Sequence, residues 1–391
     1  MHADFLVAGA GIFGVCTAIE LRSRGYSVIL LNPDEIPHPL AASTDISKII
    51  RMEYGSDSEY MDMAIASMAQ WQAWNENFQE KLYEDIGYII LSRSDRNDLS
   101  SYEASSVETL LDKGFEPEIL SSAEIKKRFP AFNVKDYKWG SYHSIGGFAH
   151  SGKAVSKLCN YAKSQGVEIH LKEVQSVIHE SGRFTKVKAS DGSEYSAGHL
   201  VLCTGNFTPY LLPELKPYMK ITGHPVFHLK PMSPEAFSIP AMTVFAADIA
   251  NTGWYGFPLH PEHGVVKIAN HSVGLELDPR TDPREVNEED VKNLRHFLSS
   301  LLPDLVDAPI VYTRRCCYTD TLDGHFWIDN HPGIDGITIG TGGSGHGFKM
   351  GPETGRMIAC TALGEEHGYS DRYLWRELGQ DTIQKEEARN N

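Results

Sequence analysis

Two adjacent cysteines, Cys316 and Cys317, have the residue type and position for covalent chemistry. The reactive form of cysteine is the thiolate, and the neighbouring Arg314 and Arg315 would lower the thiol pKa if they faced the same way. Adjacent residues on a strand point to opposite faces, so only one of the pair can face a given site. The alternative is a buried cysteine that packs as a small hydrophobic residue.

Four cationic residues have spacings that favour an anion site. Lys48 and Arg51 lie three apart in the segment DISKIIR, Lys267 follows a strand-like run, and Lys349 follows a glycine-rich segment. Helical spacing would place Lys48 and Arg51 on one side, whereas a strand would place them on opposite sides. The alternatives are surface salt bridges for Arg51 and Lys349, and a solvated strand position for Lys267.

A glycine-rich turn near the N-terminus has the spacing of a dinucleotide-binding motif. The apolar run 3–8 predicts a strand, residues 15–24 have helical spacing, and residues 26–31 form a second apolar run. Between the first strand and the helix, glycines let backbone N–H groups approach a pyrophosphate, which the partial positive charge of the helix N-terminus stabilises. The predicted contacts are Gly9, Gly11, Ile12, Phe13 and Gly14. An unrelated α/β turn is the alternative.

The second strand of this unit ends unusually. In dinucleotide-binding units an acid at this position bonds the adenosine ribose, whereas here Asn32 stands there. Asparagine can still accept a hydrogen bond from a ribose hydroxyl, but it lacks the charge that would strengthen it. Asp34 is a possible substitute.

Size and charge restrict the function. A chain of 391 residues can hold two domains. A net charge of −16 argues against nucleic-acid binding, because that contact needs cations to neutralise phosphates. No apolar run is long enough to span a membrane, and no leader is evident.

The six cysteines show no metal-ligand spacing and no disulfide pattern, so we expect no metal and a reducing, cytoplasmic setting. The absence of a C-terminal Ser-Lys-Leu-type signal makes a peroxisome the weaker expectation.

Further elements follow from composition and periodicity. Helices are expected at 58–82, 120–129, within 146–167, at 288–302 and after residue 349; strands are expected within 167–188, at 199–205, within 221–272 and at 336–341. The charged last residues, QKEEARNN, are expected to be frayed.

Four motifs, in order along the chain, carry a family resemblance. They are GAGIFG (9–14); STDISKIIR (43–51) with Tyr54-Gly55; YGFP (255–258) with KIANH (267–271); and CCYTDTLDGHFWID (316–329) with GSGHGFK (343–349). Together they resemble the flavoprotein amine oxidases typified by monomeric sarcosine oxidase and pipecolate oxidase, with fungal saccharopine oxidases and amadoriases as relatives.

The resemblance implies an α/β (α+β) fold: a glutathione-reductase-like Rossmann FAD domain with an inserted mixed-sheet substrate domain. The implied FAD-binding domain is discontinuous, at 1–80, 140–215 and 325–375. The implied substrate domain comprises 81–139 and 216–324, and residues 376–391 form a tail. A monomer is expected.

The resemblance also implies a flavin tethered through its 8α carbon to the sulfur of Cys316. The remaining implied cofactor contacts come from three parts of the chain: Ser43, Thr44, Lys48, Gly205, Gly343, Gly345, His346, Gly347, Phe348 and Lys349. His346 is either near the flavin or a structural histidine bonded to the backbone.

Catalytic and substrate roles follow from the same resemblance. Lys267 would lie near flavin N5 and activate oxygen, because a fixed cation stabilises the anion formed by the first electron transfer to O2. Lys48 would lie near the flavin face, while Arg51 and Lys349 would clamp a substrate carboxylate. Tyr255 and Tyr318 would line the pocket, with core packing as the alternative.

His271 discriminates within the family. Amadoriases carry glutamate at its position and lack arginine at that of Arg51, so these residues favour sarcosine- or pipecolate-like substrates. The implied reaction is hydride transfer from the C–N carbon of an N-methyl or N-alkyl amino acid to flavin N5, with O2 reduced to hydrogen peroxide. Alternatives are a saccharopine-like, fructosyl-amine or biosynthetic N-alkyl substrate, a non-catalytic FAD-binding protein, and an NAD-dependent dehydrogenase.

Overall fold

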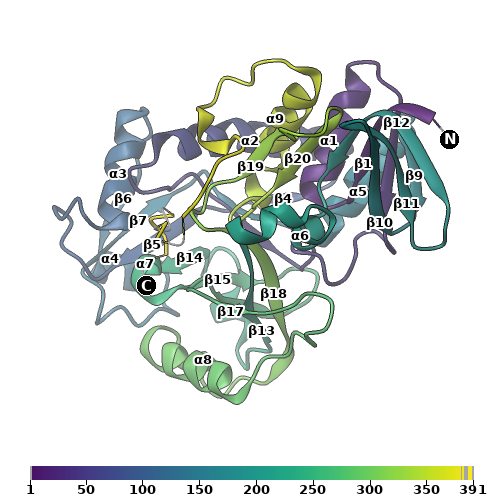
Figure 1. Ribbon diagram of the computed structural model, residues 1–391. Helices are drawn as coiled ribbons and strands as arrows, with labels where there is room; N and C mark the ends of the chain where they lie inside the picture. The colour runs from purple at the N-terminus through teal and green to yellow at the C-terminus, as the bar shows by residue number, and fades with distance from the viewer. Residues whose placement is uncertain (1, 380, 383–385, 390–391) are drawn as a thin grey trace.

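A computed structural model describes residues 2–379, 381–382 and 386–389. Its elements form two large sheets, with the first at the upper right of Figure 1 and the second at the lower left. The expectation of a mixed α/β fold is confirmed.

The first sheet is a parallel core extended by antiparallel strands. Its parallel order is β9 (Glu168–Leu171), β2 (Val28–Asn32), β1 (His2–Ala8), β12 (Glu194–Leu202) and β20 (Ile337–Thr341). Antiparallel partners are β10 (Val174–Glu180), β11 (Arg183–Ala189) and β19 (Trp327–Asn330). The predicted first strand, helix and second strand all occur here.

Helices cover one face of this sheet. They are α1 (Ile12–Ser23), α5 (Ser151–Ser164) and α9 (Gly351–Leu363), with α1 in contact with both others. Val7 and Leu30 pack in the cluster that holds the helices, while Leu6 and Leu31 pack in the cluster on the opposite face. Burial of both faces explains the continuous apolar runs of these strands.

The second sheet is mixed and supports the chemistry described below. Its order is β17 (Leu275–Glu276), β13 (Met219–Leu229), β16 (Val266–Asn270), β15 (Trp254–Leu259), β14 (Val244–Ala247), β5 (Tyr88–Ser92), β7 (Trp139–His143) and β6 (Glu118–Ser121), with β18 (Ile310–Thr321) paired along β13. Helix α8 (Glu288–Leu301) packs on one face, where Phe297 stacks on Trp254 at 4.8 Å between ring centroids. β7 crosses the expected domain boundary between residues 139 and 140.

Alternation along β16 separates its two faces. Val266 and Ile268 pack in the apolar cluster with α8, whereas Ala269 packs with residues of the opposite face. Lys267 therefore points away from α8, since successive side chains point to opposite faces.

A small sheet and α2 complete the surroundings of the site. The small sheet contains β3 (Lys48–Ile50), β8 (Gly147–Ala149) and β4 (Tyr83–Asp85). Helix α2 (Ser58–Phe78) begins at the capping residue Asp57, which accepts a hydrogen bond from the Tyr60 amide. The remaining helices are α3 (Tyr102–Asp112), α4 (Ser122–Arg128), α6 (Thr208–Leu211) and α7 (Ile249–Thr252).

Two expected helices have different bounds. Helix α2 ends at Phe78 rather than continuing to residue 82, because Gln79 adopts the left-handed conformation. The helix expected at 120–129 is α4, which begins after Ser121 because Ser121 and Glu124 form a reciprocal capping box. Residues 118–121 instead form β6.

The C-terminal residues that the structure describes are not frayed. Glu386, Ala388 and Arg389 are buried, which corrects the expectation for this part of the tail. The charges are tolerated there because they have opposite partners, including Arg389 with Asp320 at 3.0 Å. Residues 384, 385, 390 and 391 of the expected frayed segment lie outside the described residues.

Candidate active site

The glycine turn brings β1, α1 and β12 into close contact. Gly9 has a φ of +100°, and a Cβ atom there would lie 2.3 Å from the carbonyl oxygen of Cys203. A Cβ atom on Gly14 would lie 1.8 Å from the Gly9 oxygen. Helix α1 begins after Gly11, which makes no side-chain cap hydrogen bond, so amides of the first turn remain available to an anion.

Ser43 and Asn32 hold this turn. The Ile12 amide donates to Ser43 Oγ at 3.0 Å, and the Ala10 amide donates to Asn32 Oδ1 at 3.1 Å. Asn32 Nδ2 donates to backbone oxygens at residues 34 and 35. In this structure the Asn32 side chain therefore links β2 to the glycine turn. Its contact with a ribose stays a prediction.

Other predicted cofactor residues gather around this turn. Gly205 follows β12 with a φ of +53°, and a Cβ on Gly347 would lie 2.8 Å from Phe13 Cζ. Gly343 is also next to Phe13. Thr44 Oγ1 is buried without a hydrogen-bond partner among the described residues, as expected of a group that contacts a ligand.

A cavity lies between the small sheet, the second large sheet and the glycine-rich segment before α9. It is lined by Lys48, Ile49, Arg51, Ile249, Tyr255, Phe257, His271, Tyr318, Gly345, His346, Phe348 and Lys349. The lining includes every predicted catalytic and substrate residue except Lys267. Lys48 and Arg51 both reach the cavity because β3 ends at Ile50, so strand alternation does not extend to Arg51.

Arg51 and Lys349 form the predicted cation pair. Arg51 is 5% exposed, donates to the Tyr102 hydroxyl at 2.8 Å and lies 4.9 Å from the centre of the Tyr54 ring. Lys349 is 6% exposed, donates to the His346 carbonyl at 2.9 Å and lies 4.9 Å from the same Tyr54 ring. Burial, and then the charge of Arg51, hold the pKa of Lys349 well below its usual range. An anion between the two would relieve this repulsion.

Lys267 is fully buried and paired, which excludes the solvated alternative. Its Nζ lies 2.7 Å from Asp45 Oδ2, donates to the Ser47 carbonyl and lies 4.8 Å from the Phe257 ring centre. Burial lowers the pKa of Lys267 to about 8, with Asp45 opposing the shift and Lys48 adding to it. The Lys267 side chain is therefore a positive charge at neutral pH that is held in place and shielded from water.

The two cysteines of β18 occupy different environments. The Cys316 sulfur lies 3.5 Å from Lys48 Nζ and 3.8 Å from Arg314 Nη2. Burial opposes ionisation, but the charges of Lys48 and Arg314 hold the pKa of Cys316 below its ordinary value. Burial instead raises the pKa of Cys317 to about 11. Arg315 faces away from Cys316 and pairs with Asp290, so of the two neighbouring arginines only Arg314 acts on the Cys316 thiol.

His271, Tyr318 and Tyr255 form one wall. The His271 and Tyr318 ring centres are 5.8 Å apart, and Tyr255 packs in the same small cluster as Cys316 and Tyr318. His346 lines the cavity, and its Nε2 also lies 3.3 Å from the Gly324 carbonyl. The second contact agrees with a structural histidine bonded to the backbone, and contact with the flavin stays a prediction. Burial lowers the pKa of His346 to about 3, so the ring is neutral.

Sequence reasoning missed two buried carboxylates of the site. Asp45 pairs with Lys267, and its Oδ1 lies 3.3 Å from His228 Nε2. Glu386 Oε1 lies 2.9 Å from His271 Nε2. The only signal for Asp45 was its place in the DISKIIR motif; Glu386 lay in the segment expected to be frayed.

The residues present fit a flavin dinucleotide. Tight glycines and the first turn of α1 stand where a pyrophosphate would bind, and next to Ser43 the Thr44 hydroxyl has no partner among the described residues. Cations line the cavity, and one of them, Lys48, contacts the activated thiol of Cys316. Among the described residues no cluster has the geometry of a metal site. No helix within the same residues is long and apolar enough to cross a membrane.

A parallel sheet with this turn, joined to a cation-lined cavity, defines a dinucleotide-dependent redox enzyme. The chain matches the family model described as FAD dependent oxidoreductase over residues 4–361. It is 31% identical to peroxisomal sarcosine oxidase of Mus musculus, with 91% of this chain and 90% of the relative covered. It is 27% identical to monomeric sarcosine oxidase of Bacillus sp. (strain B-0618), with 98% of each covered.

The chain therefore belongs to the family of FAD-dependent oxidoreductases, which confirms the resemblance and identifies FAD as the cofactor. The solved structure of amadoriase I from Aspergillus fumigatus supports the same fold, with a TM-score of 0.82, 24% identity, and coverage of 96% of this chain and 90% of that one.

Proposed function

We propose that this protein is a flavoprotein oxidase of secondary amino acids, acting on the C–N bond of an N-methyl or N-alkyl amino acid. The observation that carries the proposal is the pair of buried cations, Arg51 and Lys349, on one cavity. Two buried cations on one cavity attract an anion, and a carboxylate matches the planar guanidinium and the ammonium. The names of the sarcosine oxidase relatives agree with such a substrate.

Two groups of cavity residues have separate tasks in this proposal. When bound, FAD accepts the hydride from the carbon next to nitrogen and returns the electrons to oxygen. Arg51 and Lys349 bind and orient the carboxylate, while the surrounding positive charge lowers the pKa of the substrate amine and favours its reactive neutral form. Tyr255, Tyr318 and His271 enclose the reacting carbon and nitrogen.

Lys267 supplies a fixed positive charge to the oxygen reaction. Because it is held between Asp45 and the Ser47 carbonyl, the charge needs no rearrangement when negative charge develops on oxygen. Cys316, activated by Lys48 and Arg314, is the proposed point of covalent attachment of the flavin. A monomer and a cytoplasmic location complete the proposal.

Paired substrates test the carboxylate clamp. Sarcosine, other N-methyl amino acids and pipecolate are each compared with the same amine lacking the carboxyl group, and hydrogen peroxide release is measured. We expect the carboxylated member to be oxidised with the higher kcat/KM in every active pair. Equal rates within the pairs would refute the clamp and require another substrate class.

Variants locate the effect. Arg51→Ala and Lys349→Ala should each lower kcat/KM by roughly 10- to 150-fold, since a charge-assisted contact contributes about 1.5–3 kcal/mol. The same variants should weaken binding of the carboxylate inhibitor methylthioacetate while leaving the flavin spectrum intact. Lys135→Ala, which removes an exposed lysine, is the matched control and should behave as the native protein.

A further inference from the structure

The end of the chain returns to the active site. Residues 386–389, here called the tail segment, are described by the structure, and three of the four are buried. Glu386, Glu387 and Ala388 contribute to the wall of a small cavity whose other side includes Tyr54 and Tyr102, the aromatic partners of Arg51. Ala388 packs in one apolar cluster with Ile249 and Ala250 of α7, the helix at the lower left of Figure 1.

Glu386 places a carboxylate among the predicted substrate contacts. Its Oε1 is 2.9 Å from His271 Nε2, and its negative charge also acts on His346 and Lys349. Burial works against ionisation of Glu386, but the contact with His271 and the charge of Arg389 hold its pKa below the usual range. Glu386 therefore places a carboxylate on His271, which lines the same cavity as Arg51 and Lys349.

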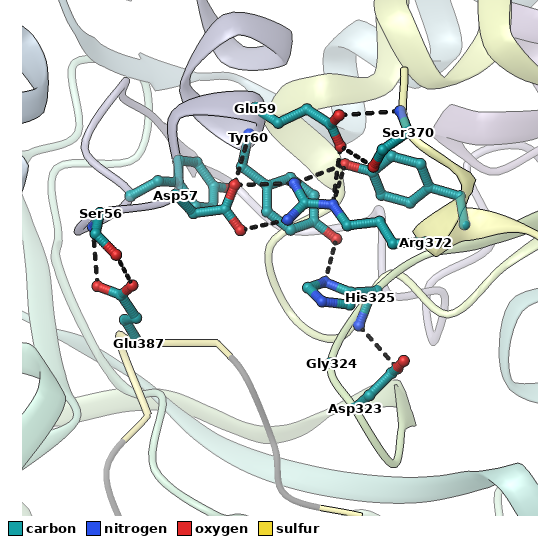
Figure 2. Close-up of polar contacts among 12 residues, drawn as sticks. Ser56, Asp57, Glu59, Tyr60, Asp323, Gly324, His325, Ser370, Arg372 and Glu387 are labelled. Carbon is teal, nitrogen blue, oxygen red and sulfur yellow. Dashed lines mark hydrogen bonds and ion pairs between the residues drawn. The ribbon is translucent and has the colours of Figure 1, made fainter.

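Polar contacts hold the tail segment in addition to the apolar packing of Ala388. Arg389 pairs with Asp320 at 3.0 Å and lies 5.6 Å from the Tyr318 ring centre. Glu387 accepts a hydrogen bond from the Ser56 amide at 2.9 Å, as Figure 2 shows. A Cβ on Gly55 would lie 1.9 Å from Glu387 Oε2, so this approach depends on glycine at that position.

A fixed anchor precedes the tail segment along the chain. Arg372 forms two hydrogen bonds with Asp57, at 2.7 and 2.8 Å, and pairs with Glu59 at 2.8 Å. Figure 2 shows this network between the start of α2 and the chain near Ser370. The anchor holds Arg372 at Asp57, which lines the same small cavity as Glu386. A tether of this kind gives Glu386 a high effective concentration at the site.

We propose that the tail segment is an internal competitor of the substrate, in which Glu386 holds His271 and sets a negative charge beside the anion pocket, and must leave before a carboxylated amine binds. This inference rests on the proposed function, because it assigns the competitor to the same anion pocket. A short segment held mainly by side-chain contacts can open locally without unfolding the protein, which makes the exchange possible. The native enzyme would consequently have a weaker apparent affinity than its pocket allows.

Neutralising Glu386 in the full-length holoenzyme tests the proposal. Glu386→Gln keeps the shape of the side chain and removes its charge, and Asp381→Asn removes a charge from an exposed position in the same part of the chain. We expect Glu386→Gln to raise kcat/KM for a carboxylated amine and to tighten binding of methylthioacetate, measured by the change in the flavin spectrum, by about tenfold. Asp381→Asn should change neither quantity.

Either of two outcomes would overturn the proposal. Weaker inhibitor binding in Glu386→Gln would show that Glu386 is a permanent wall that supports His271. Unchanged binding and kcat/KM would show that Glu386 does not compete with the substrate.

Hydrogen exchange gives a second readout that does not depend on turnover. Saturating methylthioacetate should accelerate amide exchange in residues 386–389 of the native protein, because the inhibitor displaces the tail segment. Unchanged or slower exchange on inhibitor binding contradicts the proposal. If neither the native protein nor Glu386→Gln oxidises any carboxylated amine, the proposed function fails; if both do so with equal kcat/KM, only the competitor is refuted.

Discussion

Two buried carboxylates pair with basic side chains beside the cavity, and the segments that hold the two carboxylates differ. Asp45 precedes β3 and pairs with Lys267 of β16, so both partners belong to segments held by sheets. Glu386 lies at the chain end and reaches His271 from outside the sheets. In the two proposals above, the charge that serves the oxygen reaction is fixed in the core, whereas the charge beside the substrate position is one that the protein withdraws.

The largest effect is expected at the cysteine on the Asp45 side. Cys316→Ala should abolish covalent flavin while leaving a folded protein whose flavin is extracted by acid, because the contacts at the glycine turn remain. Cys317→Ala is the matched control and should retain covalent flavin, since its thiol has a raised pKa and lies on the other face of β18. Mass mapping of flavin-containing peptides checks both. Flavin found on Cys317 would reverse the assignment.

Lys267 gives the next largest effect and separates the two half-reactions. Lys267→Met should slow reoxidation of the reduced flavin by roughly 10²–10³-fold, the cost of removing one preorganised electrostatic group. Reduction of the flavin by substrate should change much less, because Lys267 does not line the cavity. Stopped-flow measurement of each half-reaction decides the point, and equal slowing of both would make Lys267 a structural or substrate residue.

The pH dependence of reoxidation sharpens the comparison further. Lys267 is charged below its pKa of about 8 and neutral above it, so the reoxidation rate should fall as pH rises through 8. Asp45→Asn removes the carboxylate that supports the charge, and the fall should then begin at lower pH. Glu386→Gln should leave this profile unchanged, because Glu386 acts on His271 rather than on Lys267. Rates measured from pH 6 to 10 in the three proteins provide the test.

Much of this site could be predicted from local sequence because its causes are local. Strand alternation separates Cys316 from Cys317 and turns Lys267 away from α8, and both follow from the two-residue repeat of a β-strand. The glycine turn could likewise be recognised, since tight packing at Gly9 and Gly14 tolerates no side chain. Motif order supplied the family, and the family supplied the roles assigned to Arg51 and Lys349.

Other features depend on contacts between distant segments. The pairing of residue 45 with residue 267, and of residue 271 with residue 386, has no periodic signal, because each pair forms only when separate elements pack together. A run of charged residues predicts an exposed segment, because burying charges is costly unless oppositely charged partners are present. Those partners, Asp320 and His271, become neighbours of the tail segment only in the tertiary structure. The sequence by itself thus determined the dinucleotide turn and the faces of the strands, whereas only the tertiary structure decided which carboxylates meet the buried cations.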